Sequence, residues 1–327
     1  MDTTLALGLV AQAAYDLAAA AAVIAIARDL WTQRPRGWPY LAAALVATTV
    51  TWTFIILFAR ADQAQYDGYL DWVRRSIFFF TAWEAVTRAP ERWWWTSQLL
   101  FAVPPVAVFY ALESRRRRVP AVAAYVWLGF LGAISSALAL FLFRASASDE
   151  RSDERPTTSA VLVICIVLAV ASAIALPYLQ GGPYRAALLF AHAIMLVPFH
   201  VRSRDAGVSP TALYLLTGTT ALVAHIGDTV RLLSHPGWVG LPAGEATVRL
   251  IQAIAANAAQ TSVTLDLLFV WLLGAAILRQ RASRRWLAFT AVGLVASPGT
   301  ALALGLAWRE WAADRSPAPI DRRQPAS

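Results

Sequence analysis

The sequence contains no lysine, so its basic side chains are arginines and four histidines. Without a lysine amine the protein can form neither a retinal Schiff base nor any other lysine imine, and both kinds of covalent chemistry are excluded. There is one cysteine, Cys165, which excludes an intramolecular disulfide framework and a metal site built on cysteines.

Charged residues of either sign are also scarce. They make up 15% of the chain, against 58% hydrophobic residues, whereas soluble domains average about 25% and about 45–50%. The net charge of +8 comes from arginines that flank apolar runs, where we expect them to contact lipid headgroups and not nucleic acid. The composition therefore predicts an integral membrane protein whose main partner is the lipid bilayer.

Long apolar runs predict an all-α, polytopic transmembrane bundle of about nine or ten spans. The uncertain span is a short apolar core around Glu84, and Pro104-Pro105 is expected to kink or break its own span. We expect one bundle over residues 1–312, a hydrophilic linker at 145–159 between its halves, and a disordered tail at 313–327. The other expected spans lie near 5–27, 39–59, 99–112, 120–143, 160–179, 184–199, 210–233, 245–278 (with an amphipathic start) and 286–307.

Several ionisable side chains fall inside these apolar segments: Asp16, Glu84, His192, His225, Asp228, Arg231 and Asp266. An acid or an arginine at the centre of a span costs roughly 2.5–3.5 kcal/mol, so such residues normally face the bundle interior and pair with one another. We therefore expect a shared polar cavity. The structural alternatives are a Gln12–Asp16 helix contact, a satisfied structural His192, and an Arg231 that snorkels or neutralises Asp228.

Glu84 and Asp266 are the strongest candidates for chemistry. Both lie in apolar stretches, "FFFTAWEAV" and "SVTLDLLFVW", where we expect no opposite charge within one helical turn. Desolvation favours the neutral form of such an acid, and a neutral buried acid is what a proton donor requires. A purely structural role is the alternative for each.

Aromatic side chains accompany these acids: Phe80 and Trp83 near Glu84, and Trp271 near Asp266. Aromatic faces stabilise cations, so this combination suits carbocation chemistry or a hydrophobic ligand pocket. Metal-ligand spacings, phosphate-binding loops and nucleophile motifs are missing, and we predict neither a metal nor a cofactor.

With "AWE" in "FFFTAWEAV", an intramembrane aspartate in a late span and no cofactor motif, the chain resembles the small integral-membrane terpene cyclases of fungal meroterpenoid pathways. The resemblance implies acids that protonate a terminal epoxide or olefin of a prenyl chain. It assigns this role to Glu84 and Asp266, with Asp228 as an alternative.

The leading hypothesis is therefore a membrane-embedded cyclase or isomerase that acts on a prenylated, lipid-soluble substrate in a natural-product pathway. Phe80, Trp83 and Trp271 would stabilise the cation, His225 or His192 would take the proton back, and Arg231 would hold Asp228 ionised. The alternatives are a proton-coupled small-molecule transporter and a non-catalytic receptor or assembly protein. Each predicts a multi-pass protein, in the plasma membrane of a bacterium or an endomembrane of a eukaryote.

Overall fold

The protein is described by a computed structural model covering residues 3–31, 37–76, 78–148, 157–279 and 285–315. These residues form fourteen α-helices and two short 3₁₀ helices, and they contain no β-strand. The predicted all-α bundle is confirmed. Most of the expected linker (149–156) and tail (316–327) lies outside the described residues, and the predicted boundary at 312 falls inside the last helix.

The helices follow one another along the chain with short connections. They are α1 (Thr3–Trp31), α2 (Trp38–Gln63), α3 (Tyr69–Arg75), α4 (Phe78–Thr87), α5 (Pro90–Arg116), α6 (Val122–Leu131), α7 (Ile134–Ala147), α8 (Ala160–Ala175), η1 (Leu176–Tyr178), α9 (Gly181–Ala193), η2 (Val197–Phe199), α10 (Pro210–Leu233), α11 (Ala243–Ile254), α12 (Ala258–Arg279), α13 (Arg285–Val295) and α14 (Pro298–Arg315).

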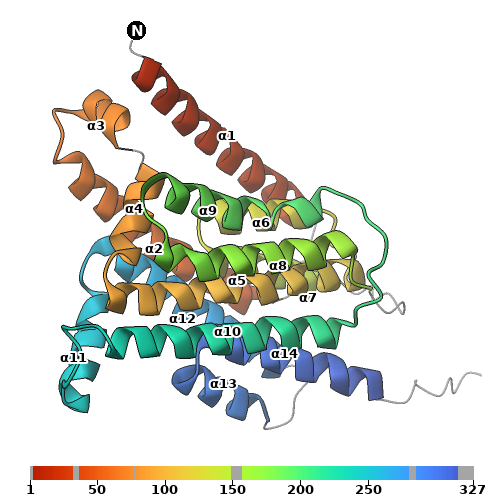
Figure 1. The fold of residues 1–327 in the computed structure, drawn as a ribbon. Coiled ribbons are helices and arrows are strands. Elements are labelled where there is room, and N and C mark those ends of the chain that lie inside the picture. The colour runs from red at the N-terminus through yellow and green to blue at the C-terminus, as the bar shows by residue number, and fades with distance from the viewer. Residues whose placement is uncertain (1–2, 32–36, 77, 149–156, 280–284, 316–327) are drawn as a thin grey trace, which may run out of the picture.

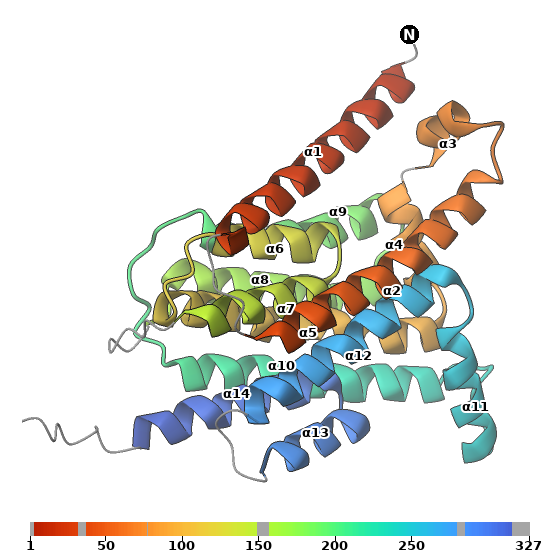
Figure 2. The ribbon, with the colours of Figure 1, turned by 180° about the vertical axis from the view of Figure 1, so that it is seen from behind.

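Helix α5 runs through the middle of the bundle. In both views α8 lies on one side of it and α10 on the other, and α14 packs against both α5 and α10 (Figures 1 and 2). Of the membrane-length helices α5 is the most enclosed, with 83% of its apolar window buried. Helix α1 crosses the bundle obliquely and packs against α3 and α6. The centre of the molecule is therefore built around α5.

Five of the described helical segments are long and apolar enough to cross a membrane: α2, α5, α8 with η1, α9 with η2, and α12. Helix α4, which carries Glu84, has 10 residues and is about 15 Å long, so it is too short to cross a hydrocarbon core of about 30 Å. Large apolar side chains on the outside of α2 and α8, such as Leu45, Ile56, Ile164 and Val167, are exposed. An exposed apolar surface of this kind is compatible with contact to lipid.

The predicted single span at 120–143 is wrong, because the chain reverses at Gly132 and Ala133. Helices α6 and α7 pack side by side, and a Cβ on Gly129 would lie 3.5 Å from that of Ala137. The two helices have 10 and 14 residues, so each is shorter than the bilayer core. They form a helical hairpin, here called the α6–α7 hairpin, with its tip at residues 131–134.

Proline has different effects at two other places. The break expected at Pro104-Pro105 does not occur, because α5 continues through both prolines while packed on several sides by other helices. The span expected at 286–307 is instead divided into α13 and α14. Pro298 begins α14, and Ser297 Oγ accepts the Thr300 N–H at 3.0 Å as a helix N-cap.

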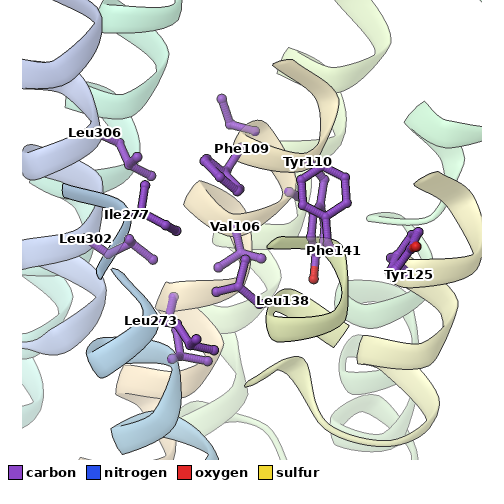
Figure 3. Close-up of a cluster of buried hydrophobic side chains, with 14 of the residues drawn as sticks. Val106, Phe109, Tyr110, Tyr125, Leu138, Phe141, Leu273, Ile277, Leu302 and Leu306 are labelled. Carbon is purple, nitrogen blue, oxygen red and sulfur yellow. The ribbon is translucent and has the colours of Figure 1, made fainter. Parts of the chain in front are cut away.

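The main core lies where α5, α7, α12 and α14 meet. Figure 3 shows Val106 and Phe109 of α5 facing Leu138 of α7, Ile277 of α12 and Leu306 of α14. Close approach depends on glycine at several contacts, since a Cβ on Gly299 would lie 3.1 Å from the backbone of Phe101 and Ala102. Tight packing around α5 fixes the elements that line the cavity described next.

Candidate functional site: an apolar cavity with a polar corner

A cavity of about 1250 Å³ lies beside α5. It is lined by α1, α2, α3, α4, α5, α8, α9 and α12 and by the α6–α7 hairpin. Most of the lining is aliphatic or aromatic, and the ionisable side chains in it, tyrosines aside, are Asp16, Arg74, Arg75, His192 and Asp266. Drug-sized ligands occupy pockets of roughly 300–1,000 Å³, so this volume is sufficient for a large small molecule.

One side of the cavity is an aromatic wall made of Phe78, Phe79, Phe80, Trp83 and Phe130. The rings of Phe79 and Phe80 meet edge to face with centroids 5.5 Å apart, and Phe79 lies 6.4 Å from Phe130. The first four residues occupy consecutive turns of α4. This short helix therefore supplies most of the wall.

His192 of α9 lies against this aromatic wall. Its ring is 4.8 Å from that of Trp83, 5.9 Å from Phe79 and 5.5 Å from Phe130. Its Nδ1 lies 2.7 Å from the Leu188 carbonyl oxygen, which can only accept a hydrogen bond, so Nδ1 carries a proton. This bond is consistent with the structural role considered for His192, while the ring still lines the cavity.

Asp266 of α12 caps the first turn of α7. Its Oδ2 accepts the Ile134 N–H at 3.1 Å and its Oδ1 accepts the Ser135 N–H at 2.8 Å. The residue before α7 is Ala133, whose side chain cannot cap a helix, so the free N–H groups are bonded by a side chain from another helix. Among the described residues no arginine or histidine lies within ion-pair distance of Asp266.

A second side chain holds the hairpin tip from the opposite direction. The Tyr15 hydroxyl of α1 donates to the Leu131 carbonyl at the end of α6. The neighbouring Asp16 also lines the cavity and accepts from Gln12 Nε2 at 3.0 Å, as the helix-contact alternative predicts. Residues on α1 and α12 therefore fix the irregular backbone between α6 and α7, which must have its polar groups satisfied inside a membrane protein.

The expectation that Glu84 lacks a cationic partner is wrong. Its carboxylate bonds Arg88, one turn further along α4, and Arg185 of α9 at 3.1 Å. Two arginines stabilise the ionised form of the acid. Glu84 also lies outside the cavity lining, although its neighbours Phe80 and Trp83 line it.

The polar stretch at 225–231 of α10 does not line the cavity either. Asp228 Oδ1 accepts from Trp93 Nε1 at 2.8 Å, and the His225 ring lies 5.0 Å from that of Trp94. Arg231 donates to the Pro177 carbonyl at 2.9 Å and lies over the Tyr178 ring. The guanidinium thus bonds a carbonyl and forms no ion pair with Asp228, contrary to the expected pairing.

Trp271 is one helical turn further along α12 than Asp266 but lies away from the cavity. Its ring packs against α13, where a Cβ on Gly293 would come within 2.3 Å of the indole Nε1. The expectation that Trp271 lines a pocket with Asp266 is therefore wrong, because the two side chains leave α12 in different directions.

Sequence analysis missed a buried ionic cluster between α5 and α14. Arg309 contacts Glu113 at 2.6 Å and Glu310 at 2.8 Å, and Arg116 bonds the same two acids. The Glu113–Arg116 spacing of i, i+3 was a readable signal for half of the cluster. The other half comes from α14, and nothing in the local sequence links it to α5.

A second missed cluster joins α1, α6 and α7. Asp29 accepts from Arg144 at 2.9 Å and from the Tyr125 hydroxyl at 3.0 Å. It lies outside the cavity lining and holds α1 against the α6–α7 hairpin.

Within the described part of the chain, no group of three or more histidine, cysteine or acidic residues is arranged to hold a metal ion. Comparisons with family models, with curated proteins and with solved structures give no match to this chain.

Proposed function

We propose that this chain is a multi-pass membrane protein that binds a prenylated, lipid-soluble small molecule in the cavity beside α5. The observation that carries the proposal is the cavity itself, with about 1250 Å³ of space and a mostly apolar lining from nine helical elements. Prenyl chains are flexible hydrocarbons, and burying one against aromatic and aliphatic side chains gains roughly 25 cal/mol per Å². The protein would lie in the plasma membrane of a bacterium or in an endomembrane of a eukaryote.

A more specific candidate is acid-initiated cyclisation of the bound prenyl chain. It is favoured by Asp266 and His192 lining the same cavity as the cation-stabilising rings of Phe80 and Trp83. Asp266 would give a proton to an epoxide oxygen, the carbon–oxygen bond would open, and alkene electrons would close the ring. A proton lost from the neighbouring carbon would return to Asp266 or pass to His192.

This second candidate requires a protonated Asp266. Both carboxyl oxygens accept a backbone N–H, whereas a protonated acid carries an O–H donor on one of them. The longer bond, from Ile134 at 3.1 Å, is the one that protonation would replace. The geometry therefore supports binding more strongly than cyclisation, and it assigns Glu84 to neither.

Binding is tested by extracting purified protein and identifying the retained lipid-soluble molecules by mass spectrometry. Ala173→Phe places a ring in the cavity, while Ala171→Phe makes the same change on the exposed side of α8. We expect prenylated molecules to be retained by wild type and Ala171→Phe and lost from Ala173→Phe. Equal retention by all three proteins, or retention of bulk phospholipid alone, would contradict the proposal.

Cyclisation is tested by product analysis with a prenylated and an epoxy-prenylated phenol in a heterologous host. We expect a cyclic product from wild type and from Glu84→Gln, and none from Asp266→Asn at matched expression. Loss of the product in Glu84→Gln instead would return the acid role to Glu84. No product from a folded wild type that still retains prenylated molecules would leave binding as the function.

A further inference from the structure

A buried hydroxyl without a partner lies in the same cavity. Tyr110 of α5 is 3% exposed and lines the cavity, and its hydroxyl has no hydrogen-bond partner among the described residues. Its ring is fixed edge to face on Phe141, with centroids 4.7 Å apart, as Figure 3 illustrates. A buried polar group is normally paired, and an unpaired one is costly. Tyr110 thus has a free donor and free acceptor positions facing a space that can hold a ligand.

Asp266 has free acceptor positions in the same cavity. A carboxylate can accept about four hydrogen bonds, and Asp266 receives one N–H on each oxygen. Its side chain is within electrostatic range of the Tyr110 hydroxyl, and it is 7% exposed. Tyr110 and Asp266 are here called the polar corner.

The polar corner selects among head groups. An ammonium only donates, and would leave the Tyr110 O–H without an acceptor. A carbonyl or a carboxylate only accepts, so it would leave Asp266 unpaired, and a carboxylate would also be repelled by it. A hydroxyl both donates and accepts, and can therefore bond both members of the corner at once.

We infer that the polar corner binds the hydroxyl of a lipid-soluble alcohol or phenol, which donates to Asp266 and accepts from Tyr110. This inference rests on the proposed binding function and names the head group of its ligand. It also orients the ligand, because the aromatic wall of α4 is the remaining large apolar surface for the prenyl tail. The tail then lies toward His192, and the hydroxyl at the α6–α7 hairpin.

The test compares three probes that differ only at the head: geranylgeraniol, its methyl ether, and the hydrocarbon that lacks the oxygen. Dissociation constants are measured by competition with tritiated geranylgeraniol on detergent-purified protein. For wild type we expect the alcohol to bind about tenfold more tightly than the ether, which cannot donate to Asp266, and the ether more tightly than the hydrocarbon.

Tyr110→Phe removes only the free hydroxyl. We expect it to weaken alcohol and ether about tenfold, to leave the hydrocarbon unchanged, and to cause no loss of thermal stability. Tyr125→Phe is the matched control, because its hydroxyl is bonded to Asp29 outside the cavity lining. That variant should lose stability while its affinities stay those of wild type.

The possible failures are distinguishable. Equal affinity of wild type for all three probes, with all three weakened by Ala173→Phe, would overturn the head-group inference, because water would then satisfy the corner, and would leave the proposed function standing. No saturable binding of any probe would overturn both.

Discussion

Asp266 shows how one carboxyl can support the fold and face the candidate site at once. It caps the first turn of α7 from a different helix and lines the cavity with the rest of its side chain. The residue is not free to be removed without consequence for the hairpin. Its contribution to stability and its contribution to binding must therefore be measured separately.

Asp266→Ala should destabilise the protein by roughly 1–2 kcal/mol, the usual cost of deleting a helix cap. Asp266→Asn keeps one acceptor oxygen and should lose less. Thermal unfolding in detergent measures both. If Asp266→Ala unfolds at the wild-type temperature, the cap does not stabilise α7.

At the residue scale, the sequence predicted which acids are embedded but not what they bond. Hydropathy alone identified Asp266 and Glu84. Arg185, which pairs with Glu84, comes from α9, and the N–H groups on Asp266 come from a helix end that was expected to be mid-span. Partners that come from distant segments leave no local pattern.

At the scale of elements, two helix contacts carry most of the testable energetics. Helix α14 meets α5 so closely at Gly299 that a Cβ there would lie 3.1 Å from backbone atoms of Phe101 and Ala102. At its other end, α14 bonds α5 through the buried Arg309 cluster. Both contacts hold the helix that forms one side of the cavity.

Gly299→Ala should destabilise the protein by about 1–3 kcal/mol, because backbone atoms cannot move aside as a flexible side chain would. Gly227→Ala is the matched control, since a Cβ on that exposed glycine of α10 meets nothing within 4 Å. It should be neutral or slightly stabilising. Equal unfolding temperatures for the two variants would show that α14 does not approach α5 in this way.

Arg309→Met should cost about 3–5 kcal/mol, because it leaves Glu113 and Glu310 buried with only Arg116 to compensate them. Arg315→Met removes an exposed arginine on the same helix, whose guanidinium lies over Trp311. That control should change the unfolding temperature little. A stable Arg309→Met would mean that the cluster does not join α5 to α14.

Helix boundaries were predicted well where apolar runs end in charge, and poorly where the chain turns inside one run. Residues 120–143 read as one span because hydropathy does not register direction. Only Gly132 hinted at the reversal. At Pro298 the local signal was present, since a serine before a proline is a common start of a helix.

At the scale of the whole molecule, the fold class followed from composition and the cavity did not. The absence of lysine and the scarcity of charge indicated an apolar bundle, and the described residues form one. The cavity depends on how α4, the α6–α7 hairpin and α9 assemble around α5, and no single segment encodes that. The binding proposal therefore rests on the assembled molecule.

The most direct test of that proposal is photolabelling with a prenyl alcohol that carries a diazirine at the far end of its chain, followed by peptide mapping. We expect label on residues 78–83 of α4 and 191–196 around His192, competed away by unlabelled geranylgeraniol. Label confined to outward-facing positions such as Leu45 of α2 or Ile164 of α8, and unaffected by the competitor, would contradict a ligand in the cavity.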